Sequence, residues 1–470
     1  METGLRCDGG VDGDDSREVF RTVDLALRVG EVVMSSGAGA ADVYASVLAV
    51  TRAGGLRHVH LDTTFGTLTI SVQSAPEVPP QTYVRTVTYR GLDYGLLTEV
   101  DHLVRELSHG DIDAGAASRR LNEIRSAPRP YPRWAVSAAS GLMAAGIGLL
   151  LQGSVLVVAI AFVTAVLIDQ LLQLMSRRRI PNFYQRVAGA LLVTLVAHGL
   201  YVLDVPVSPS VIVAAGIVLL LAGITLVGAV QDAITGYYVT ASARMFEALL
   251  LTGGIIAGVS MGLALGIRLG YELPLTARAA SALDDLPLAL VGGALVSVGF
   301  ALTCYAPVRA LLPIAAAAVT AQAIDVVLVT ARLGQAASAA AAAVLVGIVS
   351  YTLAGRFRVP PLVVIVSGIV GLLPGLTIYR GLFLLLTERD VGGFFALLTA
   401  ASVGVGLASG VLLGEYVAQP LKQRARRLEN RLAGPRLVGP LRLPTRRERR
   451  ERRARKAGER PGGDSTSAAD

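Results

Sequence analysis

Long apolar stretches separated by short polar connections occupy the chain from position 134 to position 418. Each stretch holds about 20 residues, the length that crosses the hydrocarbon core of a bilayer as a helix. The expected spans are Trp134–Gln152, Val155–Met175, Gln185–Leu203, Pro209–Val230, Phe246–Ile267, Pro287–Ala306, Ala310–Val329, Ala336–Ala354, Pro361–Leu386 and Gly392–Ala418. The pattern therefore predicts an α-helical polytopic membrane protein with about ten transmembrane helices.

Residues 17–125 show shorter amphipathic patterns, which are typical of a folded domain outside the membrane. Apolar residues at helical spacing predict two helices separated by Ser35–Gly39. Three strand-like runs and two more helices follow, at Leu56–Asp62, Phe65–Gln73, Thr82–Arg90, Leu92–Leu107 and Ala114–Ile124. The order α-α-β-β-β-α-α predicts a small α+β domain ahead of the membrane spans.

Charge is scarce and unevenly placed. Only 17% of residues are charged and 53% are hydrophobic, whereas roughly a quarter of a soluble protein is charged. The mean hydropathy is +0.57. Arginine gathers in the connections on one side of the predicted bundle, and that side is the cytoplasm by the positive-inside rule. This places the α+β domain and both termini of a multi-pass cell-membrane protein in the cytoplasm.

The two ends of the chain lack apolar periodicity. Residues 1–16 are acidic and Gly-rich, without the apolar core of a secretory signal. In the segment 419–470, 16 Lys+Arg oppose 6 Asp+Glu, a surplus larger than the +8 of the whole chain. We expect both ends to be largely disordered. The basic tail should contact anionic lipid rather than nucleic acid, because no recognition fold accompanies its charge.

The second half of the membrane region repeats the first. The pattern V-T-A-x-x-I-D occurs twice and gives each half an intramembrane threonine and aspartate, namely Thr164 and Asp169, then Thr320 and Asp325. The segment 215–225 aligns with 367–377, which sets Gly223 opposite Gly375. Five spans per half is an odd number, so the pattern predicts two inverted repeats, 134–268 and 286–418. Inverted repeats hold their substrate near the midplane at their interface.

Asp169 and Asp325 are the leading candidates for transport chemistry. An ionisable group in lipid is costly and usually functional, and a carboxyl group in a medium of low dielectric constant takes up a proton readily. On the predicted topology Asp169 lies toward the cytoplasm and Asp325 toward the outside. We therefore expect coupling to protons, with one carboxylate near each opening. The alternative is that each aspartate only joins two helices by a hydrogen bond.

The predicted ninth span is interrupted by Leu373-Pro374-Gly375. Proline removes a helical hydrogen bond and glycine adds freedom, so the helix should kink or break and free backbone groups for a zwitterionic ligand. Arg380, with Tyr379 beside it, is suited to a carboxylate. The alternative is a packing kink with Arg380 reaching the lipid headgroups. In the fifth span, Glu247 is expected to pair with Arg244.

One alternating pattern in the N-terminal segment resembles a metal site. His58, His60 and Asp62 fall on one face of a strand and are residue types that bind metals. The same alternation is typical of a half-exposed strand with Val59 and Leu61 turned to the core, which is the interpretation we favour. No Gly-rich phosphate loop or nucleophile elbow appears, so neither a cofactor nor an enzymatic activity is predicted.

Five segments of the chain occur in a characteristic order. They are Leu25–Glu31 with Ser36–Gly39, Gly55–Phe65, Pro130–Trp134 and Leu373–Gly381. Together they resemble the bacterial threonine/serine exporter family over roughly residues 20 to 418. The resemblance implies an inner-membrane carrier that exports threonine and serine, driven by the proton motive force, with an N-terminal region at 17–268 and a C-terminal region at 286–418. A homo-oligomer is compatible with it. The alternative is a membrane-anchored hydrolase or sensor acting through residues 17–125.

Overall fold

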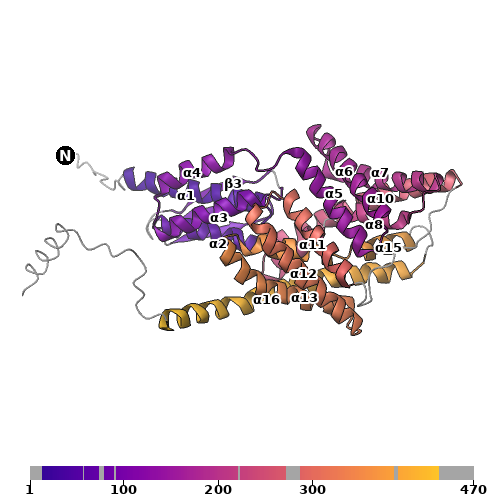
Figure 1. Cartoon of the computed structure of the whole chain (residues 1–470). Coiled ribbons are helices and arrows are strands. Elements are labelled where there is room, and N and C mark those ends of the chain that lie inside the picture. The colour runs from indigo at the N-terminus through magenta and orange to yellow at the C-terminus, as the bar shows by residue number, and fades with distance from the viewer. Residues whose placement is uncertain are drawn as a thin grey trace, which may run out of the picture. The chain divides into compact units, whose positions relative to one another are not determined.

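The computed structural model of the chain is mainly helical (Figure 1). It describes residues 13–56, 58–73, 79–88, 91–220, 223–270, 286–385 and 390–432. The N-terminal elements are α1 (Gly13–Ser35), α2 (Ala40–Ala53), β1 (Val59–Thr63), β2 (Thr67–Val72), β3 (Gln81–Thr86), α3 (Tyr94–His109) and α4 (Ala114–Ser126). Their order is the predicted one. The strands are shorter than expected, and α1 begins inside the segment predicted to be disordered.

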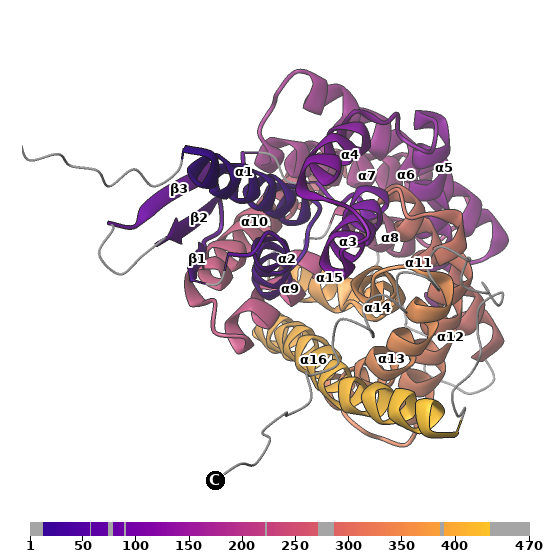
Figure 2. The ribbon, with the colours of Figure 1, turned by 90° about the vertical axis from the view of Figure 1, so that its left-hand side faces the viewer.

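Local chemistry explains how these N-terminal elements begin and pack. Asp93 and Asp113 cap α3 and α4, because each carboxylate accepts a hydrogen bond from a backbone N–H in the first turn. β2 is the central strand of an antiparallel sheet. Its Leu68 and Ile70 are fully buried, and Leu68 lies against Gly30 of α1. Figure 2 shows α1, α2 and α3 side by side, with the three strands at their left.

Within the described residues, eight helices are long and apolar enough to cross a membrane. They are α5 (Arg133–Leu150), α6 (Val155–Arg177), α7 (Asn182–Val202), α10 (Tyr238–Arg268), α11 (Leu286–Thr303), α12 (Val308–Thr330), α13 (Gln335–Phe357) and α16 (Gly392–Leu432). Large apolar side chains such as Val163 and Leu167 are exposed on them, as lipid-facing residues should be. α16 extends to Leu432, so the segment predicted to be disordered from 419 begins as helix.

Two of the expected spans are interrupted rather than continuous. In the fourth, α8 (Pro209–Leu220) and α9 (Gly223–Ile234) form a bent pair; Leu221 and Ala222 lie outside the described residues. In the ninth, α14 (Pro361–Ile369) and the 3-10 turn η2 (Val370–Leu372) precede α15 (Gly375–Phe383). The break predicted at Pro374 is confirmed, whereas the first break was not predicted. The two interruptions occupy aligned positions of the two halves.

Glycines allow corresponding helices of the two halves to pack at close range. A methyl group at Gly258 of α10 would collide with the backbone carbonyl of Val187 on α7. A methyl group at Gly410 of α16 would likewise collide with the carbonyl of Ala340 on α13. In each half, therefore, the fifth span packs on the third through small residues. The halves meet where Gly146 of α5 lies against α11.

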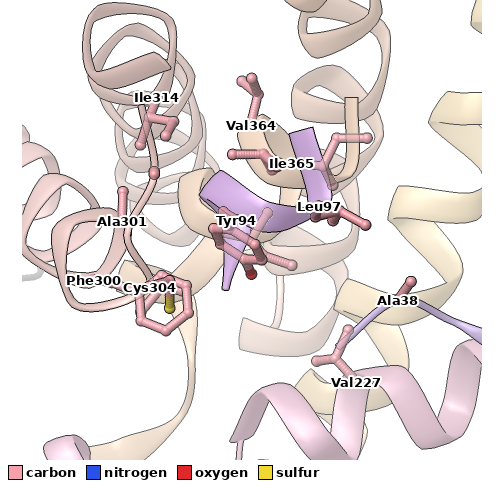
Figure 3. Packing of buried hydrophobic residues seen from close by; sticks show 14 of the residues in the cluster. Ala38, Tyr94, Leu97, Val227, Phe300, Ala301, Cys304, Ile314, Val364 and Ile365 are labelled. Carbon is pink, nitrogen blue, oxygen red and sulfur yellow. The ribbon is translucent and has the colours of Figure 1, made fainter. Parts of the chain in front are cut away.

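The N-terminal elements dock on the connections at one end of the bundle. The N–H of Tyr94 donates to the carbonyl of Cys304, 2.7 Å away, and its ring meets Phe300 edge-on (Figure 3). His102 Nε2 lies 2.9 Å from the carbonyl oxygen of Arg358. The Thr240 hydroxyl donates to the carbonyl of Thr63 over 3.4 Å. The described residues up to position 418 consequently form one compact unit, and the N-terminal elements do not pack as a separate body.

Candidate functional site

A cavity of about 230 Å³ lies beside the interruption of the ninth span. We call it the central cavity. Its apolar wall comes from α5, α8, α11 and α16, so both halves of the membrane region contribute. Its polar lining residues are Gln322, Asp325, Gln335, Thr377 and Arg380. An apolar cavity with a few convergent polar groups is the usual form of a small-molecule site.

One wall of the central cavity is a single face of α12. Gln322 and Asp325 are three residues apart and therefore neighbours on that face. The Asp325 carboxylate accepts a hydrogen bond from Ser338 of α13, with the hydroxyl oxygen 2.7 Å from Oδ1. Gln322 is only 8% exposed. The arrangement fixes a carboxylate and an amide side by side at the cavity.

The polar groups on the other side of the central cavity come from the break in the ninth span. Pro374 (φ −78°, ψ 48°) is not helical, and α15 begins immediately after it, where the N–H of Ile378 donates to the carbonyl of Pro374 over 3.0 Å. Gly375 and Thr377, in the first turn of α15, line the cavity. A helix N-terminus carries partial positive charge, and Arg380 lies farther along the same helix. The cavity thus combines a negative group on α12 with positive groups on α15.

A second, smaller cavity lies between the bundle and the N-terminal elements. It measures about 100 Å³ and is lined by the α1–α2 turn at Gly37 and Gly39 and by parts of α9, α10 and α14. We call it the junction cavity. Val370 and Leu373, at the break of the ninth span, line both cavities. These two side chains therefore stand between the central and junction cavities.

A buried ion pair holds the α1–α2 turn at the junction cavity. Arg244 Nη1 lies 3.2 Å from Asp232 Oδ2, with exposed fractions of 10% and 1%. Arg244 also donates to the carbonyl of Ala38 over 2.8 Å, and the N–H of Ala40 donates to Asp232 over 2.9 Å. The predicted pair of Arg244 with Glu247 is wrong, because Asp232 from the preceding helix meets the guanidinium instead. Glu247 lines the junction cavity.

Acidic residues line a third cavity, of about 290 Å³, between α2, α3 and the nearby ends of α13, α14 and α16. Asp42 lines this cavity and keeps an exposed surface, yet the surrounding protein desolvates its carboxylate and Asp232 repels its charge. These two effects raise the pKa of Asp42 to about 6. Burial also raises the pKa of Asp101, against the opposing effect of Arg105.

Some of the predicted site residues lie at the central cavity and others do not. Asp325, Pro374, Gly375 and Arg380 come together at the central cavity. Asp169 does not line it. Its Oδ2 accepts hydrogen bonds from Ser137 of α5 over 2.6 Å and from Gln173 over 2.7 Å. In this structure Asp169 joins α5 to α6, whereas Asp325 joins α12 to α13, so the two repeated aspartates are bonded differently.

The remaining predicted residues have no contact with the central cavity that the structure describes. Thr164 is buried, and the hydroxyl of Thr320 donates to the carbonyl of Ala316 in its own helix over 2.8 Å. Gly223 begins α9 at the unpredicted break. Tyr379 belongs to α15, and its side chain lies outside the described part of the chain.

The metal site considered for His58, His60 and Asp62 is not supported. His58 precedes β1, and all three side chains are exposed along a strand at the edge of the sheet. Among the described residues, no three His, Cys, Asp or Glu side chains are grouped so that they could hold a metal ion. The alternation therefore corresponds to a half-exposed strand.

Sequence reasoning missed three polar residues of the central cavity, Gln322, Gln335 and Thr377. Gln322 and Thr377 lie inside segments that the repeat analysis had already aligned. Gln322 occupies a variable position of the V-T-A-x-x-I-D pattern, one turn before Asp325. An intramembrane amide beside a conspicuous carboxylate was the available signal.

Comparisons with known proteins cover most of the chain. Residues 24–266 match the family described as a putative threonine/serine exporter, and residues 289–417 match the family described as threonine/serine exporter, ThrE. A probable threonine/serine exporter of Mycobacterium tuberculosis is 37% identical over 439 residues, which are 92% of this chain and 82% of that protein. A threonine/serine exporter of Corynebacterium glutamicum is 36% identical over 422 residues, or 88% and 86% of the two chains.

A shorter relative is named for a different substrate. The probable succinate transporter subunit YjjP of Escherichia coli K12 is 30% identical over 175 residues, which are 37% of this chain and 67% of that protein. No solved structure matches the chain. The relatives are named as exporters or transporters, which agrees with a non-enzymatic membrane carrier.

Proposed function

Because the chain belongs to the threonine/serine exporter family, we propose that it is a secondary transporter that moves threonine and serine out of the cytoplasm through the central cavity. One observation carries this assignment. The cavity has the Asp325 carboxylate on α12 and the positive first turn of α15, followed by Arg380, around a single volume. That distribution of charge suits a small zwitterion.

The substrate is held by its two charged ends. Its ammonium group pairs with Asp325, while its carboxylate meets the N-terminus of α15 and the Arg380 guanidinium. Discontinuous helices bind carboxylates in this way in other transporters with repeated halves. A dicarboxylate such as succinate would bring its second carboxylate toward Asp325, where like charges repel. The cavity therefore favours an amino acid over succinate.

Transport follows an alternating-access cycle. Ten spans, counting the two interrupted ones, form two inverted five-span repeats, a proposal supported by the aligned interruptions and by the matching glycine contacts of α10 and α16. Val370 and Leu373 separate the central cavity from the junction cavity. Displacing the turn that carries them joins the two volumes. The junction cavity faces the cytoplasm, because the arginine-rich connections lie at that end.

Protons drive the cycle through Asp325. A proton on this carboxylate neutralises the charge that holds the substrate ammonium, so protonation and substrate binding compete at one group. A proton entering from outside then displaces the amino acid that has arrived from the cytoplasm. Asp169, bonded to Ser137 and Gln173, contributes to proton movement nearer the cytoplasm.

Efflux from proteoliposomes tests this function. Vesicles loaded with labelled threonine, serine or succinate are compared with protein-free vesicles, with and without an imposed pH gradient. We expect faster efflux of threonine and serine, collapse of the acceleration with an uncoupler, and no acceleration for succinate.

Two variants sharpen the test. Asp325→Asn should lower threonine efflux at least about 10-fold, because a charged partner of the substrate is lost. Thr320→Val is the matched control from the same repeated motif, since its hydroxyl bonds only its own helix. The proposal fails if neither amino acid leaves faster than from empty vesicles, or if Asp325→Asn keeps full efflux.

A further inference from the structure

Gln322 is the polar group of the central cavity that nothing so far explains. Its side chain is more than nine-tenths buried and lines the cavity. It makes no hydrogen bond with any residue that the structure describes. Buried amides are almost always paired, and an unpaired one destabilises the fold. An amide that lines the cavity without a protein partner is therefore open to a ligand in that cavity.

Two of the residues next to the Gln322 side chain are glycines, which leave space around its amide group. Gly293 of α11 faces it, and a methyl group there would lie 3.3 Å from both Cβ and Oε1 of Gln322. Gly371 of η2 lies on another side, where a methyl group would be 3.8 Å from Oε1. A methyl group at position 293 would therefore require the Gln322 side chain to shift by a few tenths of an ångström.

The position of Gln322 relative to Asp325 defines which part of a ligand it meets. Side chains three residues apart on a helix are about 5–6 Å from each other at Cβ. A small amino acid whose ammonium group lies at Asp325 can therefore extend its Cβ substituent toward Gln322.

We propose that the Gln322 amide binds the side-chain hydroxyl of serine and threonine and so determines the specificity of export; this inference rests on the proposed function. The amide has one acceptor oxygen and two N–H donors, and a hydroxyl both donates and accepts, so the two groups satisfy each other. Valine has the shape of threonine with a methyl group in place of the hydroxyl. It would fill the same space and leave the amide unpaired.

A site built to bond a hydroxyl rejects the analogue that lacks it far more strongly than an apolar pocket does. From the penalty for an unpaired buried group, we expect wild-type protein to prefer threonine over valine by about 10- to 100-fold. The same preference should separate serine from alanine. Gln322→Met keeps the length of the side chain but removes its polar atoms, and the preference should then fall to about 1- to 3-fold.

The experiment measures inhibition of labelled 2-aminobutyrate uptake in proteoliposomes by unlabelled threonine, valine, serine and alanine. 2-Aminobutyrate lacks the hydroxyl, so its own transport reports the rest of the site. Gln322→Met should transport it at a rate within about 3-fold of wild type. Threonine should lose its advantage over valine in this variant. Retention of a wild-type threonine-to-valine ratio in Gln322→Met would overturn the proposal.

A second pair of variants decides the question if Gln322→Met fails to fold. Gly293→Ala presses on the native Gln322 and should reduce the threonine-to-valine ratio at least about 3-fold. Gly371→Ala, whose methyl group makes only ordinary contacts, should leave the ratio unchanged. An unchanged ratio in Gly293→Ala would refute the inference on its own. If wild-type protein transports none of these amino acids, it is the proposed function that fails.

Discussion

The Arg244–Asp232 pair joins α10 to α9 within the bundle, and each of its members also bonds the α1–α2 turn of the N-terminal elements. Both groups are almost fully buried, with the charged atoms 3.2 Å apart. Removing one member of a buried pair leaves the other charge uncompensated and costs about 3–5 kcal/mol. Arg244→Met and Asp232→Leu should each destabilise the protein by that amount. Each also deletes one bond to the α1–α2 turn, at Ala38 or Ala40.

The double variant distinguishes pairing from the sum of two separate losses. With both charges gone, the desolvation penalty disappears, and the two bonds to the turn are lost at about 1.5–3 kcal/mol each. Arg244→Met combined with Asp232→Leu should therefore cost about 2–4 kcal/mol less than the sum of the single variants. Glu123→Gln is the control. It removes an exposed carboxylate of α4 and should change stability by less than about 0.5 kcal/mol.

Hydrogen exchange of the α2 amides is the suitable assay, because it reports the free energy of local opening where the turn is held. Thermal unfolding in detergent gives an independent ranking of the same variants. We expect the single variants to lose most of the protection of α2, and the double variant to recover part of it. Additive effects of the two substitutions, or a loss in Glu123→Gln as large as in Arg244→Met, would refute the pairing.

Three further outcomes follow from the packing and the titrating groups. Gly258→Ala should destabilise the protein by about 1–3 kcal/mol in thermal unfolding, because its methyl group meets the Val187 carbonyl, whereas Gly253→Ala on the same helix meets nothing within 4 Å. Ser338→Ala removes the bond to Asp325 and should lower threonine efflux about 10-fold. Burial and Asp232 raise the pKa of Asp42 to about 6, so its protonated form favours folding. That stabilisation is complete below the ordinary pKa near 3.8 and lost as pH rises through about 6. The thermal midpoint should therefore fall between about pH 4 and pH 6, and less so in Asp42→Asn.

The sequence was most informative where one physical effect dominates. Apolar length alone located the spans, because about 20 residues are needed to cross a bilayer. Pro374 located the second break, because proline cannot donate a helical hydrogen bond. The break before Gly223 has no such residue, because alanine is the strongest helix former and glycine disfavours a helix by only about 1 kcal/mol. Its position was implied only by the alignment with the Pro374 segment.

Pairings between helices were beyond sequence reasoning. Spacing along one helix favoured Glu247 as the partner of Arg244, because residues three apart are neighbours. The actual partner, Asp232, belongs to α9, and the turn between α9 and α10 brings it back to the guanidinium. The same limit applies to Gln322. Its type and position could be read from the chain, but the face that it presents to the cavity depends on how α12 packs.

The α1–α2 turn lines the same cavity as the proposed transport pathway. Under the proposed cycle, the turn should therefore affect transport. Gly37 and Gly39 line the junction cavity together with Val370 and Leu373, and the latter two also line the central cavity. For an amino acid to enter from the cytoplasm, the junction cavity must open beside the turn that Arg244 holds. Loosening that turn should then change the rate of substrate entry as well as stability. We expect Arg244→Met to alter the external pH at which threonine efflux is half-maximal, whereas Gly258→Ala, which destabilises a distant helix contact, should lower efflux without moving that pH.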